Sequence, residues 1–150
     1  MRAIEPRTML LLGAAAPQAI RPRLLFREAR FAELNHLRAL YERAWGAAGI
    51  TISEGQLAAQ IKAFPQGQIV GCLEGSDTPV SMINIMLMAL DTRKGFQAGY
   101  EKVTGNRTFS THIGYDKLQM ELLTLGEHGL GIALCVSIAV PPEYAKNGFA

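Results

Sequence analysis

The residues best suited to chemistry lie at the end of the chain, in the run from Tyr144 to Ala150. This run offers successive backbone N–H groups, together with Lys146 and with Gly148, whose missing Cβ lets a ligand approach the backbone. If a helix begins just beyond it, free N–H groups and the positive end of the helix dipole favour a phosphate. The run therefore predicts an anion-binding loop, with an ordinary glycine turn as the alternative.

A β-strand is predicted directly before this loop, over residues 133–140. The pattern has a period of two, which is typical of an extended chain. One face carries Leu134, Val136, Ile138 and Val140, and the other carries Cys135, Ser137 and Ala139. Two prolines follow, and proline cannot donate to a sheet ladder, so the strand is expected to end at Val140.

Two helices are predicted in the first half of the chain, after a short strand over residues 24–29. Residues 31–45 place apolar side chains at spacings of three and four, which indicates an amphipathic helix that ends at Gly46 and Gly49. Ser53 and Gln56 have the spacing of a capping box, so a second helix is expected from there to Pro65.

A β-hairpin is predicted next, from the apolar runs 68–73 and 80–88. The segment between them contains Gly75, Asp77 and Pro79, which are turn residues. The connection from Met88 to Ala133 is longer than an ordinary hairpin loop, so we expect it to have structure and a task of its own.

At these residues the chain resembles the acetyl-CoA-dependent N-acyltransferases of the GNAT superfamily. Their motif begins with a strand that ends in Val-x-Pro, and a Tyr follows. The motif then continues as (Arg/Gln)-x-x-Gly-x-(Gly/Ala). In register with it stand Val140, Pro142, Tyr144, Gly148 and Ala150. The order strand, helix, helix, hairpin is also the opening order of the GNAT fold. The long connection loosely resembles that of the subgroup fused to nitrilase-like domains.

The resemblance implies an α/β (α+β) fold with a mixed, mainly antiparallel sheet and flanking helices. It implies a transferase that moves an acetyl or acyl group from coenzyme A to an amine of a small molecule or peptide. In this family, backbone N–H groups at the end of the fourth strand polarise the thioester carbonyl, and the loop binds the pyrophosphate. The implied acetyl-CoA-binding residues are Ile138, Ala139, Val140, Ala145, Lys146, Asn147, Gly148, Phe149 and Ala150. Ala145 departs from the family, which has Arg or Gln at that position.

The general base and general acid are not identified by the motif. His112 is the candidate base, because its ordinary pKa is near neutral and it lies in the long connection; a structural histidine is the alternative. Glu143 is interpreted as a solvated charge beside a helix N-terminus. Trp45 is expected either to line the acceptor pocket or to pack in the core.

The family's leaving-thiolate acid is a tyrosine on a helix after the fifth strand, beyond Ala150. Residues 23–150 are therefore expected to be the N-terminal part of a GNAT domain, truncated after the fourth strand, and to bind coenzyme A weakly or not at all. The alternative is a non-catalytic GNAT-shaped binding module or an inactive fragment. Another phosphate-binding α/β protein fits less well, because the chain lacks GxGxxG and GxxxxGK[ST] motifs.

Composition bounds the remaining possibilities. The 150 residues suit one domain with a sizeable core, and 49% of them are hydrophobic. The net charge of +2 is concentrated at the start: the first 30 residues carry six arginines and two glutamates. The remainder is slightly acidic, so neither nucleic acid nor a membrane is expected as a partner, whereas a homodimer is possible. No metal site is expected.

The start of the chain and its cysteines bear on location. Residues 1–22 have the outline of a signal peptide, but Glu5, Pro6 and an apolar run of only eight residues favour a flexible leader. Cys72 and Cys135 lie in apolar strand-like stretches, where a free cysteine is expected to be a small buried hydrophobe. Two cysteines make no disulfide framework, so a cytoplasmic protein is predicted.

Overall fold

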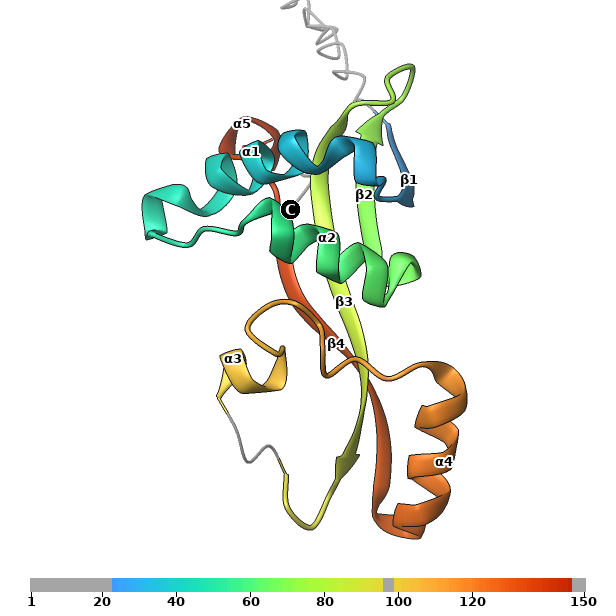
Figure 1. Ribbon diagram of the computed structural model, residues 1–150. Coiled ribbons are helices and arrows are strands. Elements are labelled where there is room, and N and C mark those ends of the chain that lie inside the picture. The colour runs from blue at the N-terminus through green and yellow to red at the C-terminus, as the bar shows by residue number, and fades with distance from the viewer. Residues whose placement is uncertain (1–22, 96–98, 147–150) are drawn as a thin grey trace, which may run out of the picture.

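Four strands form an antiparallel sheet in the computed structural model, which describes residues 23–95 and 99–146 (Figure 1). The strands are β1 (Leu24–Glu28), β2 (Gln68–Leu73), β3 (Pro79–Asp91) and β4 (Gly129–Ala139). They pair in chain order, so β4 lies at an edge of the described sheet and pairs only with β3 there. The predicted mainly antiparallel sheet with flanking helices is confirmed.

Two helices cover one face of this sheet, α1 (Leu34–Trp45) and α2 (Glu54–Ala63) (Figure 1). Three helices lie later in the chain: α3 (Tyr100–Val103), α4 (Tyr115–Leu125) and α5 (Pro142–Tyr144). Short 3-10 turns extend or join these elements at Phe31–Glu33, Gly46–Ala48, Pro65–Gly67 and Gly126–His128.

Local sequence signals explain the ends of both long helices. The predicted capping box is present: the Gln56 N–H donates to Ser53 Oγ at 3.1 Å, and the Ser53 N–H donates to Gln56 Oε1 at 3.0 Å. The end of α1 passes through a 3-10 turn to Gly49, whose φ is 73°. Glycine adopts this left-handed conformation with little steric strain. Both helix predictions are confirmed.

The hydrophobic core lies between α1, α2 and the part of the sheet where β2 is present. Its fully buried side chains come from both helices and from β2 and β3: Leu37, Leu40, Leu57, Val70 and Met82. Ala139, the last residue of β4, closes this core. We call this region the packed half.

Beyond Asn84 the sheet narrows to two strands, which form a long arm (Figure 1). The last β2–β3 pair is Gln68 with Asn84, whereas β3 and β4 stay paired as far as Asp91 with Gly129. We use "arm" for residues 85–91 and 129–135 together with α4, which contacts both strands. No residue of α4 is buried.

In the arm, the edge of β3 that faces away from β4 pairs with the long connection instead of with a strand. The Leu87 N–H donates to His112 Nδ1 at 3.0 Å, and the Leu87 carbonyl accepts from the Ile113 N–H at 3.2 Å. The connection therefore satisfies the backbone that β2 would pair in a wider sheet. The prediction that it has structure is confirmed.

Three sequence expectations need correction here. β4 begins at Gly129 instead of residue 133, and β3 continues to Asp91 instead of Met88, because the strands extend each other by pairing along the arm. Cys72 is buried as expected, but Cys135 is exposed, because it lies on an edge strand beside a bulge. Residues 1–22 lie outside the described part. None of the helices in the described ranges has the length and apolar character needed to cross a bilayer.

Candidate functional site: a pocket at the open edge of β4

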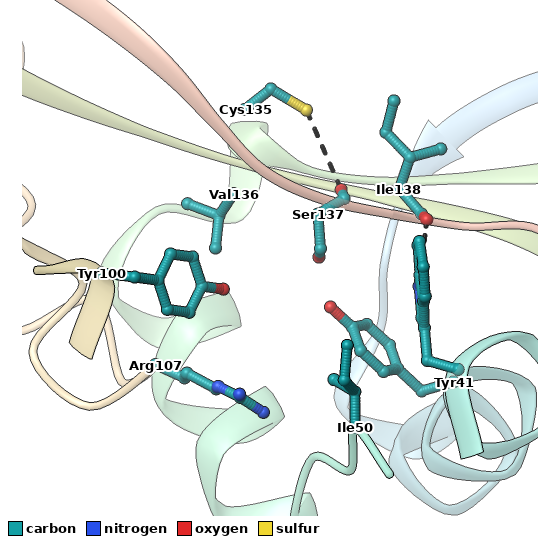
Figure 2. Close-up of a pocket in the computed structure, with 9 residues that line it drawn as sticks. Tyr41, Ile50, Tyr100, Arg107, Cys135, Val136, Ser137 and Ile138 are labelled. Atoms are coloured by element: carbon teal, nitrogen blue, oxygen red, sulfur yellow. Dashed lines mark hydrogen bonds between the residues drawn. The ribbon is translucent and has the colours of Figure 1, made fainter. Parts of the chain in front are cut away.

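A pocket of about 560 Å³ lies where β4 passes from the packed half into the arm (Figure 2). Residues 135–138 of β4 form one wall. Tyr41 and Trp45 from α1, with Ile50 from the turn after it, form another. Tyr100 and Arg107 from the long connection complete it. This volume is within the usual range for small-molecule sites.

A β-bulge shapes the β4 wall. Asn84 pairs with Ser137 and Ile85 pairs with Cys135, so Val136 is the extra residue on β4. A bulge bends the strand and re-aims neighbouring side chains, which is why the strict alternation expected over residues 133–140 fails here. The bulge lies beside Asn84, which pairs with Gln68, the first residue of β2.

The α1 wall contacts the backbone of β4 directly. Trp45 Nε1 donates to the carbonyl oxygen of Ile138 at 3.1 Å (Figure 2). Trp45 therefore lines this pocket and does not belong to the buried core, and its role toward an acceptor stays a prediction. Tyr41 lies deeper and is almost fully buried.

Arg107 is held in the pocket from three directions. Its Nη1 donates to the Thr51 carbonyl at 2.6 Å, and its backbone N–H donates to Thr104 Oγ1 at 3.1 Å. Gln60 Nε2 donates to the Arg107 carbonyl at 2.7 Å. Its guanidinium carbon also lies 5.7 Å from the centroid of the Tyr100 ring, a cation–π distance.

The backbone around Arg107 has an unusual conformation. Asn106, Arg107 and Phe109 have φ values of 54°, 66° and 59°, although none of them is glycine. Such residues carry strain that the surrounding structure must offset. The buried Phe109 side chain and the bonds to Arg107 do so.

A buried polar network lies behind the pocket. Ser137 Oγ donates to Asn84 Oδ1 at 2.7 Å, and Asn84 Nδ2 donates to Gln60 Oε1 at 2.8 Å and to Gln68 Oε1 at 2.7 Å. Gln60 then reaches the Arg107 carbonyl. Within the described ranges, no buried side-chain nitrogen or oxygen lacks a hydrogen-bond partner. The network links the β4 wall to the loop that carries Arg107.

The protonation states of the pocket follow from burial. Burial raises the pKa of Tyr41, although a hydrogen bond with Ser137 opposes the rise. Burial also raises the pKa of Tyr100, against the opposing charge of Arg107. Both phenols therefore stay protonated at neutral pH. The pocket offers two phenols, one cation and apolar walls.

Five of the nine predicted acetyl-CoA residues lie in the described part of the chain. Ile138 lines the pocket, and Ala139 is buried in the core. Val140 and Ala145 are half-buried, and Lys146 is exposed. The remaining four, Asn147, Gly148, Phe149 and Ala150, lie outside the described residues.

His112 and Glu143 lie away from the pocket wall. His112 accepts from Leu87 through Nδ1, and its ring stacks on Phe64 with centroids 4.4 Å apart. Burial lowers its pKa. Glu143 on α5 pairs with Arg43 on α1 at 3.1 Å, which joins the two helices.

Sequence reasoning missed Tyr41, Tyr100, Arg107 and Ser137 as pocket residues. Tyr41 belongs to the apolar stripe of a predicted helix, and Ser137 to the small face of a predicted strand, so both patterns indicated packing. No local signal distinguishes Arg107, because its position depends on the loop conformation. No family model, curated protein or solved structure matches the chain.

Proposed function

We propose that this chain belongs to an N-acyltransferase that moves an acetyl or acyl group from a coenzyme A thioester to an amine. The observation that carries the proposal is the open edge of β4 beside a pocket. The order β1, α1, α2, β2, β3 agrees with the opening order expected from the GNAT resemblance, and β4 follows after α3 and α4 of the long connection. That agreement supports the fold on which the proposal depends.

The open edge supplies a docking line for the pantetheine arm of coenzyme A. The N–H and C=O of one residue in an antiparallel strand point to the same side. The Ile138 carbonyl accepts a hydrogen bond from Trp45 Nε1, which lines the pocket. The Ile138 N–H would therefore face the pocket as well. In that position it would donate to the thioester carbonyl and stabilise negative charge on its oxygen.

The reaction would then proceed by direct transfer. The amine nitrogen attacks the thioester carbon, the C–N bond forms, the C–S bond breaks, and the coenzyme A thiolate takes up a proton. The amine loses its own proton to a base or to water. His112 stays a prediction for the base, and its hydrogen bond from Leu87 leaves it outside the pocket wall.

The pyrophosphate of coenzyme A would rest on backbone amides that follow Ala145, because the Ala145 N–H itself donates to the Pro141 carbonyl at 3.0 Å. Because Ala145 lacks the Arg or Gln side chain of the resembled family, the expected affinity of this chain is weak. The test is a titration of the ¹⁵N-labelled 150-residue chain with acetyl-CoA into the millimolar range. We expect the amides of Ile138, Val140 and Ala145 to shift in a saturable manner.

Two variants sharpen this titration. Ala145→Arg adds a charge-assisted hydrogen bond to phosphate and should tighten binding by about tenfold. Ala63→Arg adds the same charge on an exposed end of α2 and should change nothing. The proposal would be overturned if acetyl-CoA binding saturated without amide shifts near β4. It would also be overturned if both variants gained the same affinity for acetyl-CoA.

The second candidate is a non-catalytic binding module with the same fold, and Ala145 favours it. A module would show the same shifts with acetyl-CoA but form no acetylated amine or free thiol. Measuring thiol release in the presence of an amine panel separates the two.

A further inference from the structure

We propose that the acceptor amine also carries a carboxylate, and that Arg107 binds this carboxylate in the pocket. This inference rests on the proposed acyl transfer and names the chemical class of its acceptor. It depends on three observations: the pairing of the arginines, the way Arg107 is held, and the character of the other pocket walls.

Arg107 differs from the other described arginines in its electrostatic partners. Every other arginine in residues 23–95 and 99–146 forms an ion pair with a carboxylate: Arg23, Arg27, Arg30, Arg38, Arg43 and Arg93. For Arg107 the same ranges provide a neutral carbonyl and the face of a tyrosine ring. Its charge is half-buried at the pocket wall and is not balanced by a carboxylate there. An anionic ligand would supply that balance.

The position of Arg107 is fixed before any ligand arrives. Its N–H, its carbonyl and its Nη1 are all engaged, with Thr104, Gln60 and Thr51 respectively. A guanidinium has five N–H donors in a planar fork, so the bond to Thr51 leaves donors for a carboxylate. A pre-positioned fork loses little side-chain entropy on binding, which favours recognition of a planar anion.

The remaining walls indicate the rest of the ligand. Trp45, Ile50 and Val136 are apolar or aromatic, and the two phenols lie beside them. None of the lining residues is Asp or Glu, so the pocket holds no anion to keep an amine protonated. An acceptor with an anionic group, a neutral amine and an apolar body fits these walls. Apolar and aromatic amino acids belong to this class once their ammonium group has lost its proton.

The test compares matched ligands that differ only in the carboxylate. The ¹⁵N-labelled chain is titrated, without coenzyme A, with L-phenylalanine and phenethylamine, and separately with L-leucine and isoamylamine. The readouts are the Val136 and Ser137 amides and the Arg107 Nε–H resonance. We expect at least one amino acid to bind at least about tenfold more tightly than its decarboxylated partner, which corresponds to one charge-assisted interaction.

Variants assign this preference to Arg107. Arg107→Gln should abolish the difference within each pair, and Arg107→Lys should keep part of it. Arg93→Gln, which removes an arginine at the tip of the arm, should leave it unchanged. Circular dichroism checks that each variant keeps its fold. Equal binding within both pairs, binding of no ligand below roughly 10 mM, or a preference that survives Arg107→Gln would overturn the inference.

A second source for the anion is a phosphate of coenzyme A itself. Titration with adenosine 3′,5′-bisphosphate distinguishes it: if the Arg107 Nε–H resonance shifts with this nucleotide and not with the amino acids, the acceptor assignment is wrong. Because these titrations need no acyl transfer, they can fail while the proposed function holds, and they can succeed if no transfer occurs.

Discussion

The packed half and the arm of this molecule use the same two strands in different ways. In the packed half, β3 has neighbours on both sides and two helices above it, and Leu37, Leu40 and Met82 are fully buried. In the arm, β3 and β4 carry one helix, on which Leu123 is 83% and Met120 is 69% exposed. The difference indicates that stability is concentrated in the packed half.

The pocket lies at the boundary between these two regions. There β2 begins, β4 bulges at Val136, and the buried network of Asn84 connects the strands to α2. We infer that the packed half positions the edge of β4 at Ile138. The long connection positions the loop that carries Arg107.

We expect the largest change in unfolding free energy from a comparison of two substitutions, one on a helix of the packed half and one on the helix of the arm. Leu40→Ala removes a fully buried side chain and should lower the free energy of unfolding by about 3 kcal/mol, within the usual 2–5 kcal/mol. Leu123→Ala removes an exposed side chain of α4 and should change it by less than about 0.5 kcal/mol. Urea unfolding measures both. Similar costs for the two variants would show that the arm is packed as tightly as the core.

The next prediction concerns the buried hydrogen-bond network at the boundary between the packed half and the arm. Asn84→Ala leaves polar groups of Gln60, Gln68 and Ser137 without their partner and should cost about 2 kcal/mol. The exposed Asn35→Ala on α1 is the control and should be close to neutral. Urea unfolding gives the free energies, and amide shifts of residues 135–138 report the pocket wall. A neutral Asn84→Ala with unchanged shifts would show that the network does not join the two regions.

The smallest effect concerns pH and the junction formed by His112, which stacks on Phe64 of the packed half and accepts from Leu87 of the arm. Burial lowers its pKa, so the unfolded chain binds a proton more readily than the folded one. The stabilisation is present above the ordinary pKa of about 6.5 and is lost as the pH falls through the lower folded-state pKa.

The measurement is the thermal midpoint between pH 7.5 and pH 5. His112→Asn keeps an acceptor for Leu87 but cannot titrate, so its midpoint should fall by a few degrees less than that of the wild type. His128→Asn at the exposed tip of the arm serves as the control and should follow the wild type. Identical pH profiles for the wild type and His112→Asn would exclude this role of His112.

The parts of the fold that local signals encode could be predicted from the sequence. The capping box at Ser53, the glycine at position 49 and the turn residues between β2 and β3 each act over a few residues, and each appears where expected. The end of β4 is one residue from the predicted position, because proline excludes further pairing.

The pocket could be predicted only in part, because it depends on contacts between distant segments. Ile138 and Trp45 were indicated by the resemblance, but Arg107 comes from a connection in which three residues other than glycine have positive φ. Local propensity disfavours that conformation, and tertiary bonds to Gln60 and Thr51 maintain it. The exposure of Cys135 likewise depends on a bulge that periodicity does not show.

Residue-resolved hydrogen exchange along β4, with and without millimolar acetyl-CoA, tests whether coenzyme A docks on the edge of β4 at Ile138. We expect the Ile138 amide to exchange fast in the free chain and to slow in proportion to ligand occupancy, while the Val70 amide of the internal strand β2 stays slow throughout. An Ile138 amide already as protected as Val70 without ligand, or one whose exchange acetyl-CoA leaves unchanged, would show that coenzyme A does not dock on this edge.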